Sequence, residues 1–97
     1  MTVEEAKDVL NQCRCEIDAI DRRIVAILNE RSRVVERIGE VKRSMDFPVY
    51  EPKREDEVYA NIESANQGPI SRDAIRRIFE RIIDEMRTLQ RSRMEGK

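Results

Sequence analysis

The sequence contains no histidine and no tryptophan, and its 97 residues include only 3 glycines and 3 prolines. Without histidine there is no imidazole general base, no Ser-His or Cys-His nucleophile pair and no common zinc ligand set. Aromatic residues make up 4 % of the chain, and turn-forming residues are too few for a β-sandwich or a β-barrel. We therefore expect an all-α protein without a histidine-based catalytic centre or a common zinc site.

An excess of charge of one sign is also missing. The chain has 19 Lys and Arg against 20 Asp and Glu, a formal net charge of −1. No overall field favours a nucleic acid or a membrane as partner, and no apolar run is long enough to span a bilayer. Cys13 and Cys15 diverge by about 200° around a helix axis, so we expect free thiols. With no secretory signal in the first residues, this predicts a cytoplasmic protein.

Apolar residues recur at alternating spacings of three and four, which is typical of amphipathic helices. A capping box at Thr2–Glu5 begins the first run, and the first break is Phe47-Pro48, so a helix is predicted to about Ser44. A shorter helix is predicted over 54–65, where a Gly-Pro pair follows. A third helix is predicted over 71–93, with a serine as its N-cap.

The length of the first helix predicts an oligomer. At 1.5 Å per residue it would be roughly 60 Å long, more than one compact domain of this size spans. One short and one medium helix cannot cover its apolar stripe, and monomers rarely expose so large an apolar surface. We therefore expect residues 1–97 to form a single all-α domain in an intertwined homodimer with antiparallel long helices. The alternative is a monomeric hairpin whose first helix bends at Gly39.

Four polar side chains occupy positions where the apolar stripes predict buried residues. Arg31 follows Ile27 by four residues, and Lys42 lies eleven residues further, so both project from one face about 16 Å apart. Gln90 and Glu55 hold comparable positions on the other two helices. Buried charges are costly unless they are paired, so the group predicts a polar pocket. Its surplus of positive charge favours an anionic ligand such as a carboxylate.

Arg14 suggests how two chains share this pocket. Along one helix it lies about 25 Å from Arg31 and about 42 Å from Lys42, too far for one small molecule to reach all three. An antiparallel second copy would bring Arg14 of the partner subunit beside Arg31. The homodimer is thus predicted to complete the site as well as to cover the apolar stripe.

Several segments recur in the order and spacing of a known family. They are Arg14 with Ile17-Asp18-Ala19-Ile20-Asp21, Asn29-Glu30-Arg31, Ile38-Gly39-Glu40-Val41-Lys42, Pro48-Val49-Tyr50-Glu51-Pro52-Lys53-Arg54-Glu55, and Ile82-Ile83 with Gln90. Over nearly its whole length the chain resembles the all-helical class of chorismate mutases, small three-helix proteins that form intertwined dimers. The resemblance implies rearrangement of chorismate to prephenate, a step towards phenylalanine and tyrosine. That reaction is unimolecular and pericyclic, and it needs no metal, nucleophile or redox cofactor.

The resemblance also implies a role for each candidate residue. Arg14 of the partner subunit and Arg31 would bind the two substrate carboxylates. Lys42 would contact a carboxylate and the ether oxygen, where negative charge develops. Gln90 would donate to the same ether oxygen, and Glu55 would accept from the substrate hydroxyl.

Three further positions belong to the family pattern, and two of them depart from it. Glu51 and the Arg54 backbone would assist near the hydroxyl, but Glu51 stands where well-known bacterial members carry Asp. Met86 stands where those members carry a Ser that contacts a carboxylate, so one hydrogen bond is lost. We expect weaker substrate binding with the cationic centre intact.

Two other interpretations stay open. An isochorismate pyruvate-lyase shares this fold and the two Arg positions, the Lys position and the Gln position, but the Arg54-Glu55 pair belongs to the mutase pattern and is not expected in the lyase. A non-catalytic dimerisation or regulatory module would use the inward charges as a balanced ion-pair network. The excess of cations over Glu55 favours a ligand site instead.

Overall fold

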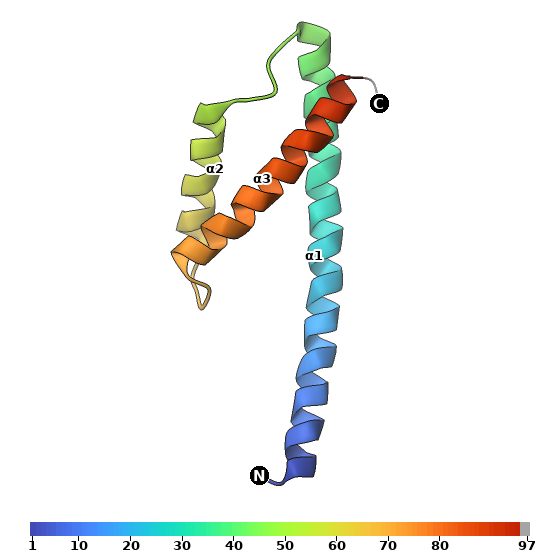
Figure 1. Ribbon diagram of the computed structural model, residues 1–97, viewed down its shortest axis with the longest axis vertical. Coiled ribbons are helices and arrows are strands. Elements are labelled where there is room, and N and C mark those ends of the chain that lie inside the picture. The colour runs from blue at the N-terminus through green and yellow to red at the C-terminus, as the bar shows by residue number, and fades with distance from the viewer. Residues whose placement is uncertain (96–97) are drawn as a thin grey trace. The chain divides into compact units, whose positions relative to one another are not determined.

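Three helices account for most of residues 1–95, the part of the chain that the computed structural model describes (Figure 1). They are α1 (Val3–Met45), α2 (Pro52–Ala65) and α3 (Arg72–Met94). The prediction of one long, one short and one medium helix is confirmed. Gly96 and Lys97, the end of the predicted domain, lie outside the described residues.

The chain divides into two compact units, Met1–Arg33 and Val34–Lys97, and each is described by itself. In the first unit, the Thr2 hydroxyl accepts a hydrogen bond from the Glu5 backbone N–H at 3.1 Å, as the capping box predicts. The apolar side chains of its helix are exposed in the single chain, with Ile20 at 47 % and Ile27 at 59 %. The homodimer that would cover them stays a prediction.

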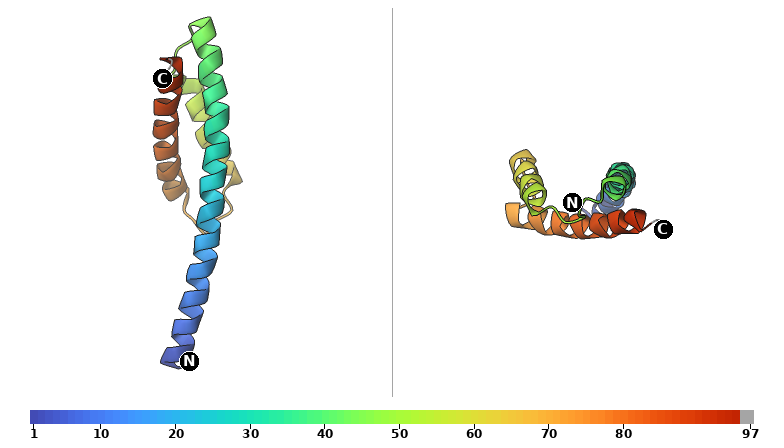
Figure 2. Two further views of the ribbon diagram at one scale, coloured as in Figure 1. Left: turned by 90° about the vertical axis from the view of Figure 1, so that its right-hand side faces the viewer. Right: turned by 90° about the horizontal axis from the view of Figure 1, so that it is seen from above.

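In the second unit, a small core forms where the end of α1 meets α3 (Figure 2). Val35 of α1 and Ile83 of α3 are buried. α1 continues unbroken through Gly39, where a Cβ would lie 3.2 Å from both the Arg93 Cβ and the Gln90 carbonyl oxygen. The lack of a side chain at Gly39 therefore lets the two helices approach closely.

α2 packs against α3, and polar side chains near the loop between the two helices hold them together. The Ser71 hydroxyl caps α3 by accepting from the Ala74 N–H at 3.1 Å, as expected. The Glu63 carboxylate of α2 pairs with Arg72 at 2.9 Å and with Arg76 at 3.1 Å. These hydrogen bonds lower the pKa of Glu63 below its ordinary value.

α2 begins two residues earlier than expected, at Pro52, because proline suits the first position of a helix, where an N–H would have no partner. Within residues 1–95, no helix is long and apolar enough to cross a membrane.

Candidate active site

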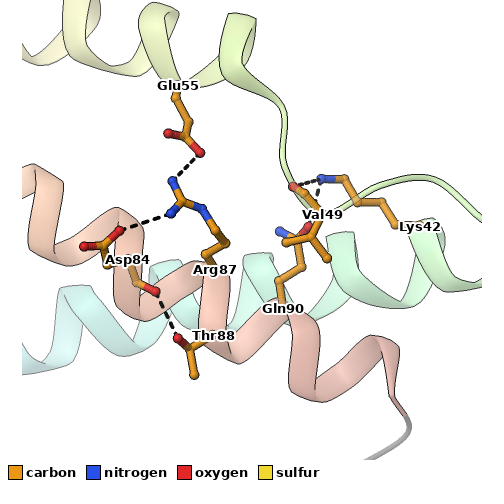
Figure 3. Close-up of polar contacts among 7 residues, drawn as sticks. All are labelled: Lys42, Val49, Glu55, Asp84, Arg87, Thr88 and Gln90. Atoms are coloured by element: carbon orange, nitrogen blue, oxygen red, sulfur yellow. Dashed lines mark hydrogen bonds and ion pairs between the residues drawn. The ribbon is translucent and has the colours of Figure 1, made fainter.

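Lys42 and Gln90 are the two buried polar residues in the described part of the chain, at 7 % and 9 % exposure. They come from different helices, α1 and α3, and the Lys42 ammonium donates to the Gln90 side-chain oxygen at 2.8 Å (Figure 3). Both were predicted to point inward from their places on the apolar stripes. A cation and an amide that share one buried position are costly unless each finds partners.

The Lys42 ammonium has three polar partners. Besides Gln90, Lys42 donates to the Val49 backbone oxygen at 3.1 Å and forms an ion pair with Glu51 at 2.9 Å. The Glu51 side chain is 47 % exposed, so it is the partner most easily displaced by an incoming anion. Because the Gln90 oxygen accepts from Lys42, its amide nitrogen is left as a donor and has no acceptor within residues 1–95.

The end of α1 brings these acceptors back to Lys42. The Phe47 N–H donates to the Lys42 carbonyl at 2.8 Å and the Asp46 N–H to the Arg43 carbonyl at 3.4 Å, with Asp46 at a φ of 58°. This is the Schellman pattern of helix termination. It reverses the chain, so that Val49 and the residues after it pass the side chain of Lys42.

A second polar cluster links α2 to α3. The Arg87 guanidinium donates to the Glu55 carboxylate at 2.6 Å and to Asp84 at 3.2 Å (Figure 3). The Arg87 and Glu55 side chains are half-buried, at 25 % and 23 % exposure. Arg87 also lies over the Tyr50 ring, 5.6 Å from its centroid. The hydrogen bond to Glu55 raises the pKa of Arg87 above its ordinary value, so the guanidinium stays charged.

The start of α2 borders an open pocket of about 510 Å³. Its lining residues are Glu51, Pro52, Lys53, Arg54 and Glu57. The Arg54 side chain is 60 % exposed and pairs with Glu57 at 3.3 Å. It therefore lies in solvent, which agrees with a contribution from the Arg54 backbone alone. Glu51 therefore lies between this pocket and the buried ammonium of Lys42.

The remaining candidates are placed as follows. Met86 is buried at 9 % exposure and belongs to the core of the second unit. Arg14 and Arg31 belong to the unit Met1–Arg33, where Arg14 is exposed and donates to the Asn11 side chain at 3.4 Å. Arg31 is half-buried.

The sequence profile described as chorismate mutase type II matches residues 13–91. The chain belongs to this family. A bifunctional chorismate mutase/prephenate dehydratase of Aquifex aeolicus is 35 % identical over 86 residues, which cover 84 % of this chain and 24 % of that protein. A chorismate mutase of Methanocaldococcus jannaschii is 26 % identical over 89 % of this chain and 88 % of its own length.

A solved structure gives the same result for the fold. The chorismate mutase (form II) of Thermus thermophilus superposes with a TM-score of 0.83 at 34 % identity, over 84 % of this chain and 93 % of that one. The chain spans about a quarter of the length of the bifunctional relatives that it matches. The fold expected of an all-helical chorismate mutase is therefore confirmed.

Two features of this chorismate mutase family chain were missed by sequence reasoning. The first is the ion pair of Lys42 with Glu51, which the predicted excess of cations over Glu55 does not include. The second is Arg87, which pairs with Glu55 across α2 and α3. The signal for Arg87 was its position three residues before Gln90, which places both side chains on neighbouring turns of one α3 face.

Proposed function

We propose that this chain is a chorismate mutase that converts chorismate to prephenate in the biosynthesis of phenylalanine and tyrosine. The observation that carries the proposal is the buried hydrogen bond between Lys42 and Gln90. A family chain that keeps a cation and an amide donor together out of water has the groups that this rearrangement uses. The names of the relatives support the same activity.

The proposed mechanism is electrostatic and conformational. The enzyme holds chorismate in its diaxial, chair-like conformer, so that the two reacting ends meet. The carbon–oxygen ether bond breaks as a carbon–carbon bond forms, and negative charge develops on the ether oxygen. The Lys42 ammonium and the Gln90 amide nitrogen donate to that oxygen, in a position from which water is largely excluded.

Binding of the substrate carboxylates is assigned to cations. Arg31 and Arg14 of the partner subunit bind one carboxylate each, and a carboxylate also takes the place of Glu51 on Lys42. This assignment needs a homodimer, which the exposed apolar side chains of α1 support. We place the enzyme in the cytoplasm, where reducing conditions keep the free thiols of Cys13 and Cys15 reduced.

A non-catalytic helical module is the second candidate, because Lys42 is fully paired in the free chain. A balanced network is what a structural role predicts. The partial exposure of Glu51 favours catalysis, because a substrate carboxylate arriving from solvent can take its place on Lys42. The two candidates differ in what chorismate does to the protein.

The decisive experiment mixes the purified chain with chorismate, follows the loss of ultraviolet diene absorbance and identifies the product by chromatography. Enzyme-dependent prephenate confirms the proposal. A parallel assay with isochorismate tests the lyase, which would release pyruvate. No product from either substrate, with no protection by chorismate against thermal unfolding, would contradict an enzyme and favour the module.

A further inference from the structure

Arg87 is a cation of α3 that reaches across to a proposed substrate ligand on α2. Its Nη2 atom lies 2.6 Å from the Glu55 Oε2 atom, the shortest ion pair between α2 and α3 in residues 1–95. Both side chains are three-quarters covered. A charge-assisted hydrogen bond at this distance and burial is stronger than an exposed pair.

The surroundings of Arg87 fix its guanidinium in place. Nη1 is held by the Asp84 carboxylate at 3.2 Å, and the Tyr50 ring lies against the group. Its Nε atom is buried and has no hydrogen-bond partner among the residues that the structure describes. With Nη1 and Nη2 held by carboxylates from two helices, Arg87 has little freedom to turn towards another anion.

The consequence for Glu55 is geometric. Oε2 is occupied by Arg87, whereas Oε1 accepts no hydrogen bond from any of residues 1–95. A half-buried carboxylate without a cation would turn towards water. Arg87 prevents this and leaves one oxygen of fixed position as an acceptor. Because Arg87 and Gln90 are three residues apart on α3, the same helix face carries the support for Glu55 and the amide donor (Figure 3).

We propose that Arg87 is a positioning residue that holds Glu55 with one carboxylate oxygen open to the substrate hydroxyl, next to the Lys42–Gln90 pair. The proposal rests on the proposed function and deepens it. Arg87 acts through Glu55 and does not touch the substrate.

The experiment compares steady-state kinetics for chorismate in the wild type, Arg87→Met, Arg87→Lys, Glu55→Gln and the double variant Arg87→Met/Glu55→Gln. Arg87→Met keeps the length of the side chain and removes its charge. We expect kcat/KM to fall by about tenfold or more, with most of the loss in KM, because a hydroxyl contact is made in the ground state too. Arg87→Lys keeps a cation and restores part of the loss.

The double variant separates positioning from direct contact. If Arg87 acts only through Glu55, Arg87→Met has no further effect on kcat/KM in the Glu55→Gln background. Equal losses in both backgrounds would overturn the proposal, since Arg87 would then act without Glu55. Wild-type kinetics in Arg87→Met would overturn it as well.

Arg76→Met is the matched control. Arg76 is also an α3 arginine that pairs with an α2 glutamate, Glu63, and it lies 4.1 Å from the centroid of the Tyr59 ring. It is eleven residues, about 16 Å along the axis, from Arg87. We expect a lower Tm and unchanged kinetics. An equal loss of kcat/KM in Arg76→Met would make the Arg87 effect merely structural. If the wild type itself fails to consume chorismate, the proposed function falls first and this proposal with it.

Discussion

The polar neighbours of the buried Lys42 ammonium offset the cost of removing its charge from water. The ammonium has three partners of different kinds: a backbone carbonyl and the amide oxygen of Gln90, which accept hydrogen bonds, and the carboxylate of Glu51, which forms an ion pair. Val49 and Gln90 hold the ammonium in place, whereas Glu51 is half-exposed and exchangeable. We therefore propose that catalysis depends on a fixed pair, Lys42 with Gln90, and that the entering substrate displaces the Glu51 carboxylate.

Replacing Gln90 by glutamate tests its role as a donor. A neutral amide does not titrate in the working range, but a glutamic acid donates only while it is protonated. We expect Gln90→Glu to confine turnover to acidic pH, where the protonated acid still donates to the ether oxygen. The measurement is kcat against pH for both proteins. Equal activity of Gln90→Glu at pH 5 and pH 8 would remove Gln90 from that role.

Among the helices, the close packing of α1 on α3 sets the distance between Lys42 and Gln90, the two side chains proposed to act in catalysis. Gly39 lies on the same α1 stretch as Lys42, and its contacts on α3 are Gln90 and Arg93. Arg93 also pairs with Glu36 of α1, so the helices are joined on both sides of the glycine. A methyl group added at position 39 would therefore raise the helix propensity of α1 but would disturb its packing against α3.

The sign of the change in stability caused by Gly39→Ala shows which of these two effects is larger. Inside an exposed helix the change would stabilise the protein by about 1 kcal/mol. Here the new Cβ would meet a Cβ and a backbone oxygen at 3.2 Å, and neither is the end of a flexible side chain. We expect a lower Tm and reduced turnover, measured by thermal unfolding and by the chorismate assay. A raised Tm with normal turnover would show that the helices do not approach so closely.

The ion pairs between α2 and α3 give the second element-scale prediction, a dependence of stability on pH. Hydrogen bonds from Arg72 and Arg76 lower the pKa of Glu63 from its ordinary value of 4.5. A carboxyl whose pKa is lower in the folded state stabilises the protein above pH 4.5 and loses that contribution as the pH falls through its folded-state value. We expect the wild type to have a higher Tm than Glu63→Gln at about pH 7, with the difference shrinking below pH 4.5.

Glu57→Gln provides the control for this series, because its partner Arg54 is on the same helix and both side chains are more than half exposed. Its Tm difference from the wild type should be small at every pH. A Glu63→Gln difference that is constant with pH would contradict a charge effect.

The three helices could largely be predicted from the sequence. The period of the apolar residues and the serine and threonine caps placed the helix ends within two residues, and Lys42 and Gln90 were found because each interrupts an apolar stripe. The Lys42–Glu51 pair could not be predicted, since it depends on how residues 46–51 turn back towards the end of α1. The role of Arg87 could not be predicted, because the sequence of a highly charged helix does not show which cation pairs with which carboxylate on another helix.

In the whole molecule, the proposed site requires two chains. The isoleucines of α1 are exposed in the single chain, and a second chain would bury them. The proposed site also includes Arg14 of the partner subunit. Mixing Arg14→Ala chains with Arg31→Ala chains tests this sharing. Each mixed dimer has one site with both arginines intact, so random exchange should restore about a quarter of wild-type turnover. Either variant mixed with itself is the control, and no recovery after proven exchange would contradict a shared site.

Lys42→Ala tests whether the buried Lys42–Gln90 pair is responsible for the proposed formation of prephenate. The measurement is enzyme-dependent prephenate production from chorismate, with helicity checked by circular dichroism and exposed Lys7→Ala as control. We expect Lys42→Ala to lose about 10²-fold or more of kcat at unchanged helicity, while Lys7→Ala keeps wild-type turnover. Near-normal prephenate formation by Lys42→Ala would contradict this expectation.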